Sequence, residues 1–191
     1  MNENEKIVCN IFLKRFGIIL NEIPKNPPQK TPDFAFEISG FKILAEQKTI
    51  EGNSTHLSQM NRVEIDEGLQ KIHFFEKSEF KNPDPTWFKM ANLLKNASDH
   101  FKNLDNSYNS VIILNKDYQD ISDLDDVLNG FITTGKFTEP LPSDAYSALQ
   151  KLSAQIHLIF WINEKENELY VRFIGEIPEA IRTFFQEKLN A

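Results

Sequence analysis

The sequence predicts a fold of the α/β or α+β class, because expected helices and strands alternate along its 191 residues. Apolar residues recur with helical spacing in several segments, and short apolar runs such as VIILN at 111–115 suit buried strands. About 40% of the residues are hydrophobic and 12% are aromatic, which is enough for a substantial core. The length fits a single domain that covers residues 1–191.

The first elements expected along the chain are a helix and two strands. Residues 4–20 are predicted to be helical, with a broad apolar stripe that extends as far as Ile19. The segment IPKNPPQKTP then excludes a helix or a central strand, since proline has a fixed φ and no backbone N–H. Two strands are predicted next, at 33–38 and 41–49.

Residues 51–84 are predicted to be an insertion. Within it, LSQMNRVEIDEGLQ has partly helical spacing, KIHFFEKSEF is typical of a strand, and NPDP breaks the chain. A regular pattern returns at 86–103, TWFKMANLLKNASDHFKN, where an amphipathic helix is predicted.

The second half is expected to complete the domain with further strands and helices. A strand is predicted at 111–115, followed by a short helix, DLDDVLN, that Ser122 caps and Gly130 ends. Another helix is predicted at 144–155. The remaining expected elements are a hairpin of IHLIFWIN and ELYVRFIG that turns at EKEN, and a final helix, PEAIRTFFQEKLN.

The net charge of −7 is distributed unevenly. Residues 1–102 contain 14 basic and 14 acidic side chains, whereas residues 103–191 contain 7 and 14. A general electrostatic attraction to nucleic acid is therefore not expected, although a neutral or locally basic face on the first half stays open. No run of 18 apolar residues and no signal-peptide pattern is present, and Cys9 is the only cysteine. These features predict a cytoplasmic protein without a membrane span.

The stretch TPDFAFEISGFKILAEQK, at 31–48, is expected to form a hairpin in which Ser39 and Gly40 are a two-residue turn. This register places apolar side chains on one face of the hairpin and polar side chains on the other, almost without exception. The apolar face collects Phe34, Phe36, Ile38, Phe41, Ile43 and Ala45, with Gln47 at its end. The polar face collects Asp33, Ala35, Glu37, Lys42, Leu44, Glu46 and Lys48.

Three ionisable side chains meet at the open end of this hairpin. Asp33 lies directly opposite Glu46, and Lys48 shares a face with Glu46 because side chains alternate along a strand. Two opposed carboxylates repel each other, so something should offset their charge. A divalent cation would do so, since Mg²⁺ is held by one or two carboxylates with water and phosphate. The sequence therefore predicts a metal site at this end of the hairpin.

Pro32-Asp33, followed after twelve residues by Glu46-Gln47-Lys48, resembles the PD-(D/E)xK signature of the restriction-endonuclease-like nucleases. The predicted element order over residues 3–116 also resembles the αβββαβ core of that superfamily. The resemblance implies a mixed central sheet flanked by helices, here with a C-terminal hairpin and helix added. It further implies an endonuclease that hydrolyses phosphodiester bonds with Mg²⁺, or Mn²⁺ as a substitute. DNA is expected as its substrate in preference to RNA, although the sequence itself does not decide between them.

The same resemblance assigns roles to individual residues. Asp33 and Glu46 would hold the metal, with the backbone carbonyl of Gln47 as a further ligand. Lys48 would orient or deprotonate the attacking water, or stabilise the charged phosphorane. Many members add an acidic residue from the first helix, and here Glu5 lies nearer the edge of the apolar stripe than Glu3.

Plainer interpretations of these residues stay open. Asp33 can be a turn residue after Pro32, and Glu46 with Lys48 can be a solvated strand face. The alternative function is a catalytically inactive protein of the same fold that acts as a binding or interaction module, which the acidic second half favours. The four histidines lack zinc-ligand spacing. Nucleic acid is the expected partner, no membrane is expected, and a homodimer stays open.

Overall fold

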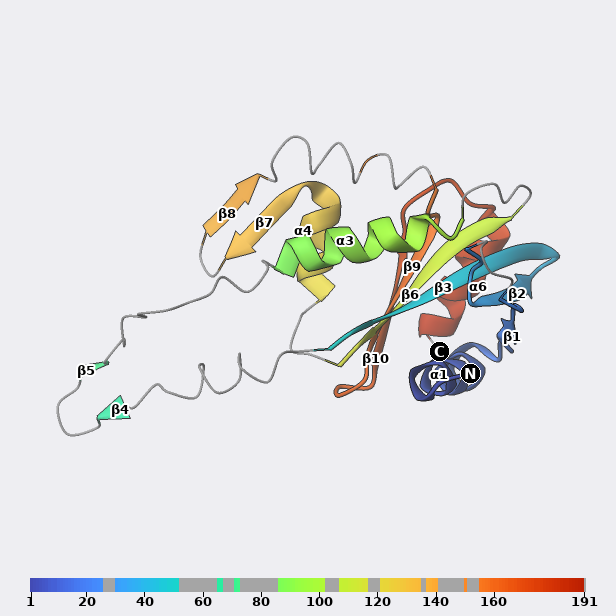
Figure 1. Cartoon of the computed structure of the whole chain (residues 1–191), viewed down its shortest axis with the longest axis horizontal. Helices are drawn as coiled ribbons and strands as arrows, with labels where there is room; N and C mark the ends of the chain where they lie inside the picture. Colours follow the sequence, from blue (N-terminus) through green and yellow to red (C-terminus); the bar gives the residue numbers. More distant parts are fainter. Residues whose placement is uncertain are drawn as a thin grey trace.

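The structure, a computed structural model, is an α/β fold built on an open mixed sheet (Figure 1). It describes residues 1–25, 30–51, 65–66, 71–72, 86–101, 107–116, 121–134, 137–140, 150 and 155–190. Within these residues the sheet has six strands in the order β1-β2-β3-β6-β9-β10. Their bounds are Asn21–Glu22 (β1), Phe34–Ile38 (β2), Phe41–Ile50 (β3), Tyr108–Asn115 (β6), Leu158–Asn163 (β9) and Glu168–Phe173 (β10). The predicted α/β class is confirmed.

The sheet joins antiparallel edges to a parallel centre. β2 is antiparallel to both of its neighbours, β1 and β3. The strands β3, β6 and β9 run parallel, and β9 with β10 forms the antiparallel hairpin predicted around EKEN. From Asn109 to Asn115, β6 is buried without interruption, as expected for a central parallel strand covered on both faces. The predicted strand at 111–115 was too short, because β6 begins at Tyr108.

Helices cover both faces of the sheet. The helices α1 (Glu3–Phe16) and α6 (Glu179–Asn190) pack on one face, and α3 (Thr86–Ser98) and α4 (Ile121–Asn129) pack on the other. Two small sheets stand apart from the central one: β4 (Ile65–Asp66) with β5 (Lys71–Ile72), and β7 (Phe131–Thr134) with β8 (Phe137–Pro140). No helix among the described residues is both long and apolar enough to cross a lipid bilayer.

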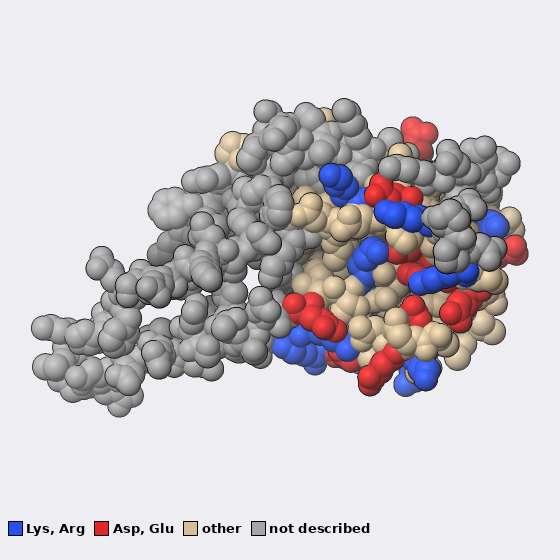
Figure 2. All heavy atoms as spheres, viewed as in Figure 1, with Lys and Arg blue, Asp and Glu red and all other residues tan. Residues whose placement is uncertain are grey.

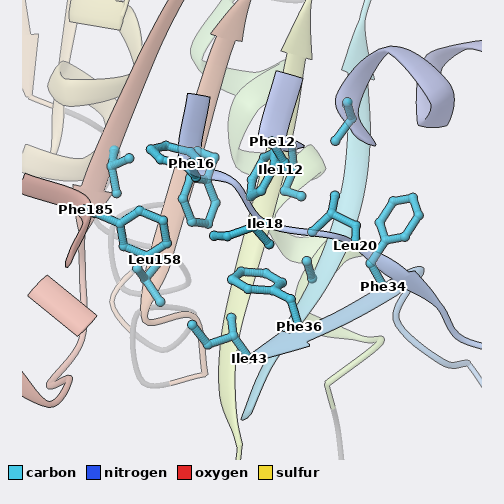
Figure 3. Packing of buried hydrophobic residues seen from close by; sticks show 14 of the residues in the cluster. Phe12, Phe16, Ile18, Leu20, Phe34, Phe36, Ile43, Ile112, Leu158 and Phe185 are labelled. Atoms are coloured by element: carbon cyan, nitrogen blue, oxygen red, sulfur yellow. The ribbon is translucent and has the colours of Figure 1, made fainter. Parts of the chain in front are cut away.

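The core beneath α1 and α6 is rich in phenylalanine (Figure 3). The Phe12 ring meets the Phe160 ring edge to face at 4.9 Å between centroids, and Phe16 meets Phe185 in the same way at 5.0 Å. Such pairs add about 0.5–1.5 kcal/mol each to the burial of their area. The apolar hairpin residues Phe34, Phe36, Ile38, Ile43 and Ala45 join this core, as predicted.

A second core lies beneath α3 and α4, and it corrects the prediction of a polar second face. Leu44 on β3 packs with side chains from both helices and from β6 and β9. The hairpin face that carries Leu44 is therefore solvated only in part, because two helices from later in the chain cover much of it. The fully buried residues of this core include Met90, Val111, Ile113 and Leu124.

The first helix is shorter than predicted. It begins with a capping box in which Asn2 and Glu5 exchange hydrogen bonds, and it ends at Phe16, not at residue 20. Gly17 takes the left-handed conformation, with φ of 71°, and its N–H bonds to the last turn of the helix. The following residues are extended, so Ile18 is buried whereas Ile19 is 69% exposed. Ile19 was therefore wrongly placed on the apolar helix stripe.

Two further helix boundaries differ from the prediction. The helix α3 ends at Ser98, before 103, and α4 begins at Ile121, so Ser122 lies inside the helix and does not cap it. Gly130 ends α4 with φ of 85°, as predicted. Most of the predicted helix at 144–155 and most of the predicted insertion at 51–84 lie outside the described residues.

Candidate functional site

The β2–β3 hairpin brings Asp33 and Glu46 together in the predicted register. Ser39 and Gly40 both have positive φ, 51° and 81°, and Ile38 pairs with Phe41 across this turn. The pairing continues to Phe34 and Ala45, so Asp33, one residue further, stands opposite Glu46. The Gln47 backbone N–H donates a hydrogen bond of 2.9 Å to Oδ2 of Asp33, which ties the aspartate to β3 beyond the end of β2.

Glu46 is almost completely buried, which the sequence did not indicate. Its side chain is 3% exposed, and the Lys48 ammonium lies 2.7 Å from its Oε1. Burial raises the pKa of Glu46 to about 7, the hydrogen bond from Lys48 lowers it, and the Asp33 charge adds to the rise. The predicted sharing of a face by Glu46 and Lys48 is confirmed. Their interpretation as a solvated strand face does not fit a carboxylate this buried.

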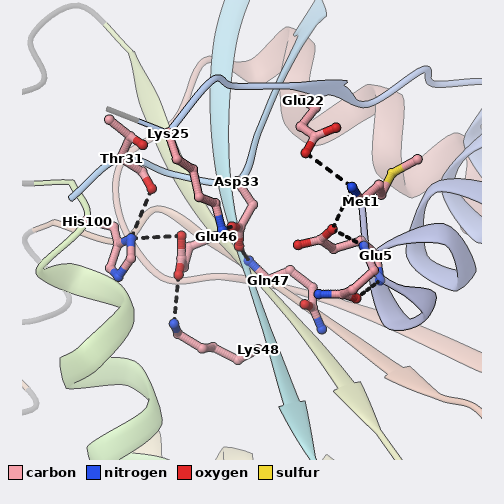
Figure 4. A network of polar contacts seen from close by, with 11 residues as sticks. Met1, Glu5, Glu22, Lys25, Thr31, Asp33, Glu46, Gln47, Lys48 and His100 are labelled. Carbon is pink, nitrogen blue, oxygen red and sulfur yellow. Dashed lines mark hydrogen bonds and ion pairs between the residues drawn. The ribbon is translucent and has the colours of Figure 1, made fainter. Parts of the chain in front are cut away.

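His100, which the sequence did not single out, lies beside Glu46 in the turn that follows α3 (Figure 4). Its Nδ1 is 3.0 Å from the backbone carbonyl of Thr31 and 3.2 Å from Oε2 of Glu46. A carbonyl can only accept, so Nδ1 carries the hydrogen and donates it to Thr31. Oε2 of Glu46 therefore has no hydrogen-bond partner among the described residues, despite its short distance to His100.

His100 could have been found from the sequence only through its neighbour. Phe101 is 4% exposed, and its burial anchors the turn that holds His100 over β3. An apolar residue near the end of an amphipathic helix predicts the position of His100 only weakly, because it does not indicate which strand the turn approaches. The ligand-spacing argument missed His100 because its partners, Thr31 and Glu46, are distant in the sequence and are not histidines.

Lys25 is the second residue that the sequence did not single out. Its Nζ lies 2.9 Å from Oδ1 of Asp33, and its side chain is 63% exposed (Figure 4). The hydrogen bond and charge of Asp33 raise the pKa of Lys25, burial lowers it, and Glu5 and Glu46 raise it further. Each of the two opposed carboxylates thus has a lysine of its own. The chain itself supplies cations that offset the repulsion expected between Asp33 and Glu46.

Of the two candidate acidic residues in the first helix, Glu5 faces the site region and Glu3 is exposed. Oε2 of Glu5 accepts the Asn2 N–H at 2.6 Å, which completes the helix cap. Glu5 is buried and lies near enough to Lys25 to raise the pKa of that lysine. A role for Glu5 as a metal ligand stays a prediction, because its carboxylate already serves the cap.

Gln47 is oriented by the backbone pairing on either side of it. Its N–H points toward β2, where it reaches Asp33. The C=O of a strand residue points to the same edge as its N–H, so the Gln47 carbonyl also points past the end of β2. Pro32 stands opposite Gln47 in the extended register and has no N–H to donate to that carbonyl. The side chain of Gln47 instead donates to the Thr49 hydroxyl at 2.8 Å.

The donor set suits a hard divalent cation in type but is small in number. Two carboxylates and one backbone carbonyl are oxygen ligands of the kind that Mg²⁺ takes, and Glu46 offers a buried oxygen that no described residue hydrogen-bonds. In the described part of the chain, however, no three His, Cys, Asp or Glu side chains are grouped so that they could hold a metal. Any ion here would complete its coordination with water or substrate oxygens.

No known protein family, curated protein or solved structure matches this chain.

Proposed function

We propose that this chain is a metal-dependent endonuclease with a restriction-endonuclease-like fold, and that it hydrolyses phosphodiester bonds of DNA in preference to RNA. The arrangement of Asp33, Glu46 and Lys48 carries the proposal. Asp33, directly before β2, stands opposite Glu46 of β3 when the register is continued by one residue, and a lysine two residues after Glu46 shares its face. The element order supports it too. Apart from β4 and β5, which form a separate small sheet between β3 and α3, the elements α1, β1, β2, β3, α3 and β6 follow the αβββαβ order of the superfamily that the motif resembles.

Each residue of the site would have its own role in catalysis. Asp33, Glu46 and the Gln47 carbonyl would hold Mg²⁺ or Mn²⁺. The bound ion would polarise the phosphate and supply hydroxide near neutral pH. Asp33 is positioned by the Gln47 N–H, and Glu46 is held between Lys48 and the His100 ring. The Lys48 ammonium would stabilise negative charge on the phosphorane, since a fixed cation beside developing charge lowers the barrier.

A non-catalytic interaction module is the second candidate, and the lysine pairing favours it. Asp33 and Glu46 are each balanced by a lysine, which a purely structural site would also show. The surface points the same way. In Figure 2, basic and acidic side chains are interspersed over the described part of the visible face, without a broad basic area. A nuclease with this surface would depend on a few local contacts to phosphate.

A cleavage screen with matched controls separates the two candidates. Single-stranded, double-stranded and branched DNA and RNA are incubated with Mg²⁺, Mn²⁺ or EDTA. We expect metal-dependent cleavage by the wild type, and its loss in Asp33→Ala, Glu46→Ala and Lys48→Ala. Glu37 and Lys42 pair across the same hairpin and are exposed, so Glu37→Ala and Lys42→Ala should cleave normally.

Residues that act as one unit are not additive, so double substitutions within the site should be little worse than single ones. Cleavage that persists in Asp33→Ala would come from a contaminant or from another site. A wild type that cuts no substrate and gains no stability from Mn²⁺ would leave the interaction module as the better account.

A further inference from the structure

Lys25 is placed at the candidate site by the backbone as well as by its own charge. The Ile23 N–H bonds to the carbonyl of Asp33 at 2.9 Å, which fixes the start of this segment against the end of β2. Lys25 follows two residues later, and its ammonium reaches Oδ1 of Asp33. Figure 4 shows the lysine extending toward the space between Asp33 and Glu46. Glu5 and Glu46 also raise the pKa of this lysine, so its charge interacts with all three acidic side chains of the predicted site.

The two oxygens of Asp33 are engaged differently. Oδ2 accepts a backbone N–H from β3, a contact that belongs to the folded hairpin. Among the described residues, Oδ1 has one partner, the ammonium of Lys25, whose side chain is 63% exposed. The carboxylate of this pair is buried but its ammonium is open to water, and ion pairs screened by water contribute about 0–1 kcal/mol, so the contact of Lys25 is exchangeable. An incoming divalent ion would take Oδ1, and it would repel an ammonium that remained a few ångströms away.

We propose, on the basis of the metal site above, that Lys25 is an exchangeable cation of that site: a divalent ion displaces it from Asp33, and the freed ammonium then binds a phosphate of the substrate. Lysine binds phosphate as a mobile point charge, which suits a group that must change partner. The exchange also gives a chain with a net charge of −7 a cation for nucleic acid beside its reactive centre.

Lys30 provides a matched control. It belongs to the same proline-rich segment, its side chain is 59% exposed, and it pairs with Asp99 and not with Asp33. Lys30→Gln and Lys25→Gln remove the same charge from the same region. Any general gain in cation affinity from lost positive charge should therefore appear in both variants, and only competition at Asp33 should be specific to Lys25.

The first measurement is Mn²⁺ binding to the full-length protein by calorimetry. We expect Lys25→Gln to bind Mn²⁺ about two- to fivefold more tightly than the wild type, which is the size expected for removing an ion pair whose ammonium is screened by water. Lys25→Arg should bind no more tightly than the wild type, because arginine keeps the charge and can grip a carboxylate with two donors. Lys30→Gln should match the wild type. Equal affinities for wild type and Lys25→Gln, or equal gains in both glutamine variants, would overturn the proposal.

The second measurement uses an oligonucleotide substrate at saturating Mn²⁺. Lys25→Gln should raise KM by about two- to fivefold and leave kcat within twofold, because the lost phosphate contact contributes to binding. In Lys25→Gln, binding of Mn²⁺ should thus become tighter and binding of the oligonucleotide weaker. A merely structural role of Lys25 would weaken the binding of both. An unchanged KM would overturn the phosphate step.

These outcomes are distinct from failure of the metal site itself. If wild type and Lys25→Gln both bind no Mn²⁺, the proposed function fails along with the exchange. If the wild type binds Mn²⁺, Asp33→Asn does not, and Lys25→Gln behaves as the wild type, the metal site stands and the exchange alone is wrong.

Discussion

Glu46→Gln tests the electrostatics of the site without any knowledge of a substrate. The substitution keeps the size of the side chain and removes its ionisable group from a position that is 2% exposed. In the wild type, burial raises the pKa of Glu46 from 4.5 to about 7. We therefore expect the stability difference between the two proteins to change with pH.

The direction of this pH dependence follows from the state, folded or unfolded, in which the carboxyl group binds its proton more tightly. A carboxyl group whose pKa is higher in the folded protein than in the unfolded chain binds its proton preferentially in the folded state. Its contribution to stability is fully present below pH 4.5 and is lost as the pH rises through the interval from 4.5 to about 7. One pKa unit corresponds to about 1.4 kcal/mol, so the full loss is about 3 kcal/mol. Glutamine does not titrate and should escape this loss.

Urea unfolding of both proteins in EDTA, at about pH 5 and about pH 8, measures the effect. From the lower to the higher pH, the free energy of unfolding of Glu46→Gln should rise relative to the wild type by about 2–3 kcal/mol. Glu37→Gln, on an exposed position of the same hairpin, should show almost no such change. A Glu46→Gln difference that is the same at both pH values would refute the inference that this carboxyl is buried and hard to ionise.

Three further substitutions test the surroundings of Glu46. Lys48→Met removes the cation that lies 2.7 Å from Glu46. In urea at about pH 8 it should lower the free energy of unfolding by about 1–3 kcal/mol. An unchanged free energy of unfolding would mean that the Lys48–Glu46 pair is not formed. Asp33→Asn should change the free energy of unfolding in EDTA by less than about 1 kcal/mol, because loss of the Lys25 pair and relief of carboxylate repulsion offset each other. In thermal unfolding it should lose the stabilisation by Mn²⁺ that the wild type shows, about 2.7 kcal/mol at a hundredfold excess over the dissociation constant. Lys95→Gln, on the exposed side of α3, should weaken DNA binding and lower its salt dependence more than Lys188→Gln on α6, and equal effects would place the DNA surface elsewhere.

The hairpin could be predicted because the residues that determine its register are close together in the sequence. A two-residue turn at Ser39-Gly40 sets the register, and a period-2 pattern on both sides says which face is buried. From these two facts, the opposition of Asp33 and Glu46 follows without knowledge of any other element. The end of α1 was missed although its signal was also local, since Gly17 was read as part of an apolar stripe that continues in extended backbone.

The environment of the hairpin could not be predicted because it comes from distant segments. In the sequence, Leu44 was an apolar exception on a polar face, and a solvated face stayed open for Glu46, but α3 and α4 cover the face on which they lie. Lys25 reaches the site from the proline-rich segment, and His100 reaches it from the turn after α3. No spacing rule links these residues to the motif, because their approach depends on how the helices pack on the sheet.

The burial of Glu46 bears on the choice between a nuclease and an interaction module. One oxygen of this buried carboxylate has no hydrogen-bond partner in the described part of the chain. Such a group lowers stability, and an amide or an apolar residue there would serve the fold better. An interaction module presents its surface and has no use for this group, whereas a metal site needs a deprotonated oxygen held in place. Glu46→Gln therefore distinguishes a nuclease from an interaction module, because a nuclease should gain stability and lose Mn²⁺ binding in the same variant. A variant that is more stable at about pH 8, binds no Mn²⁺ and does not cleave indicates that Glu46 is held for chemistry at the expense of the fold. A variant that is more stable and equally able to bind Mn²⁺ would place the metal elsewhere and remove the main argument for the nuclease.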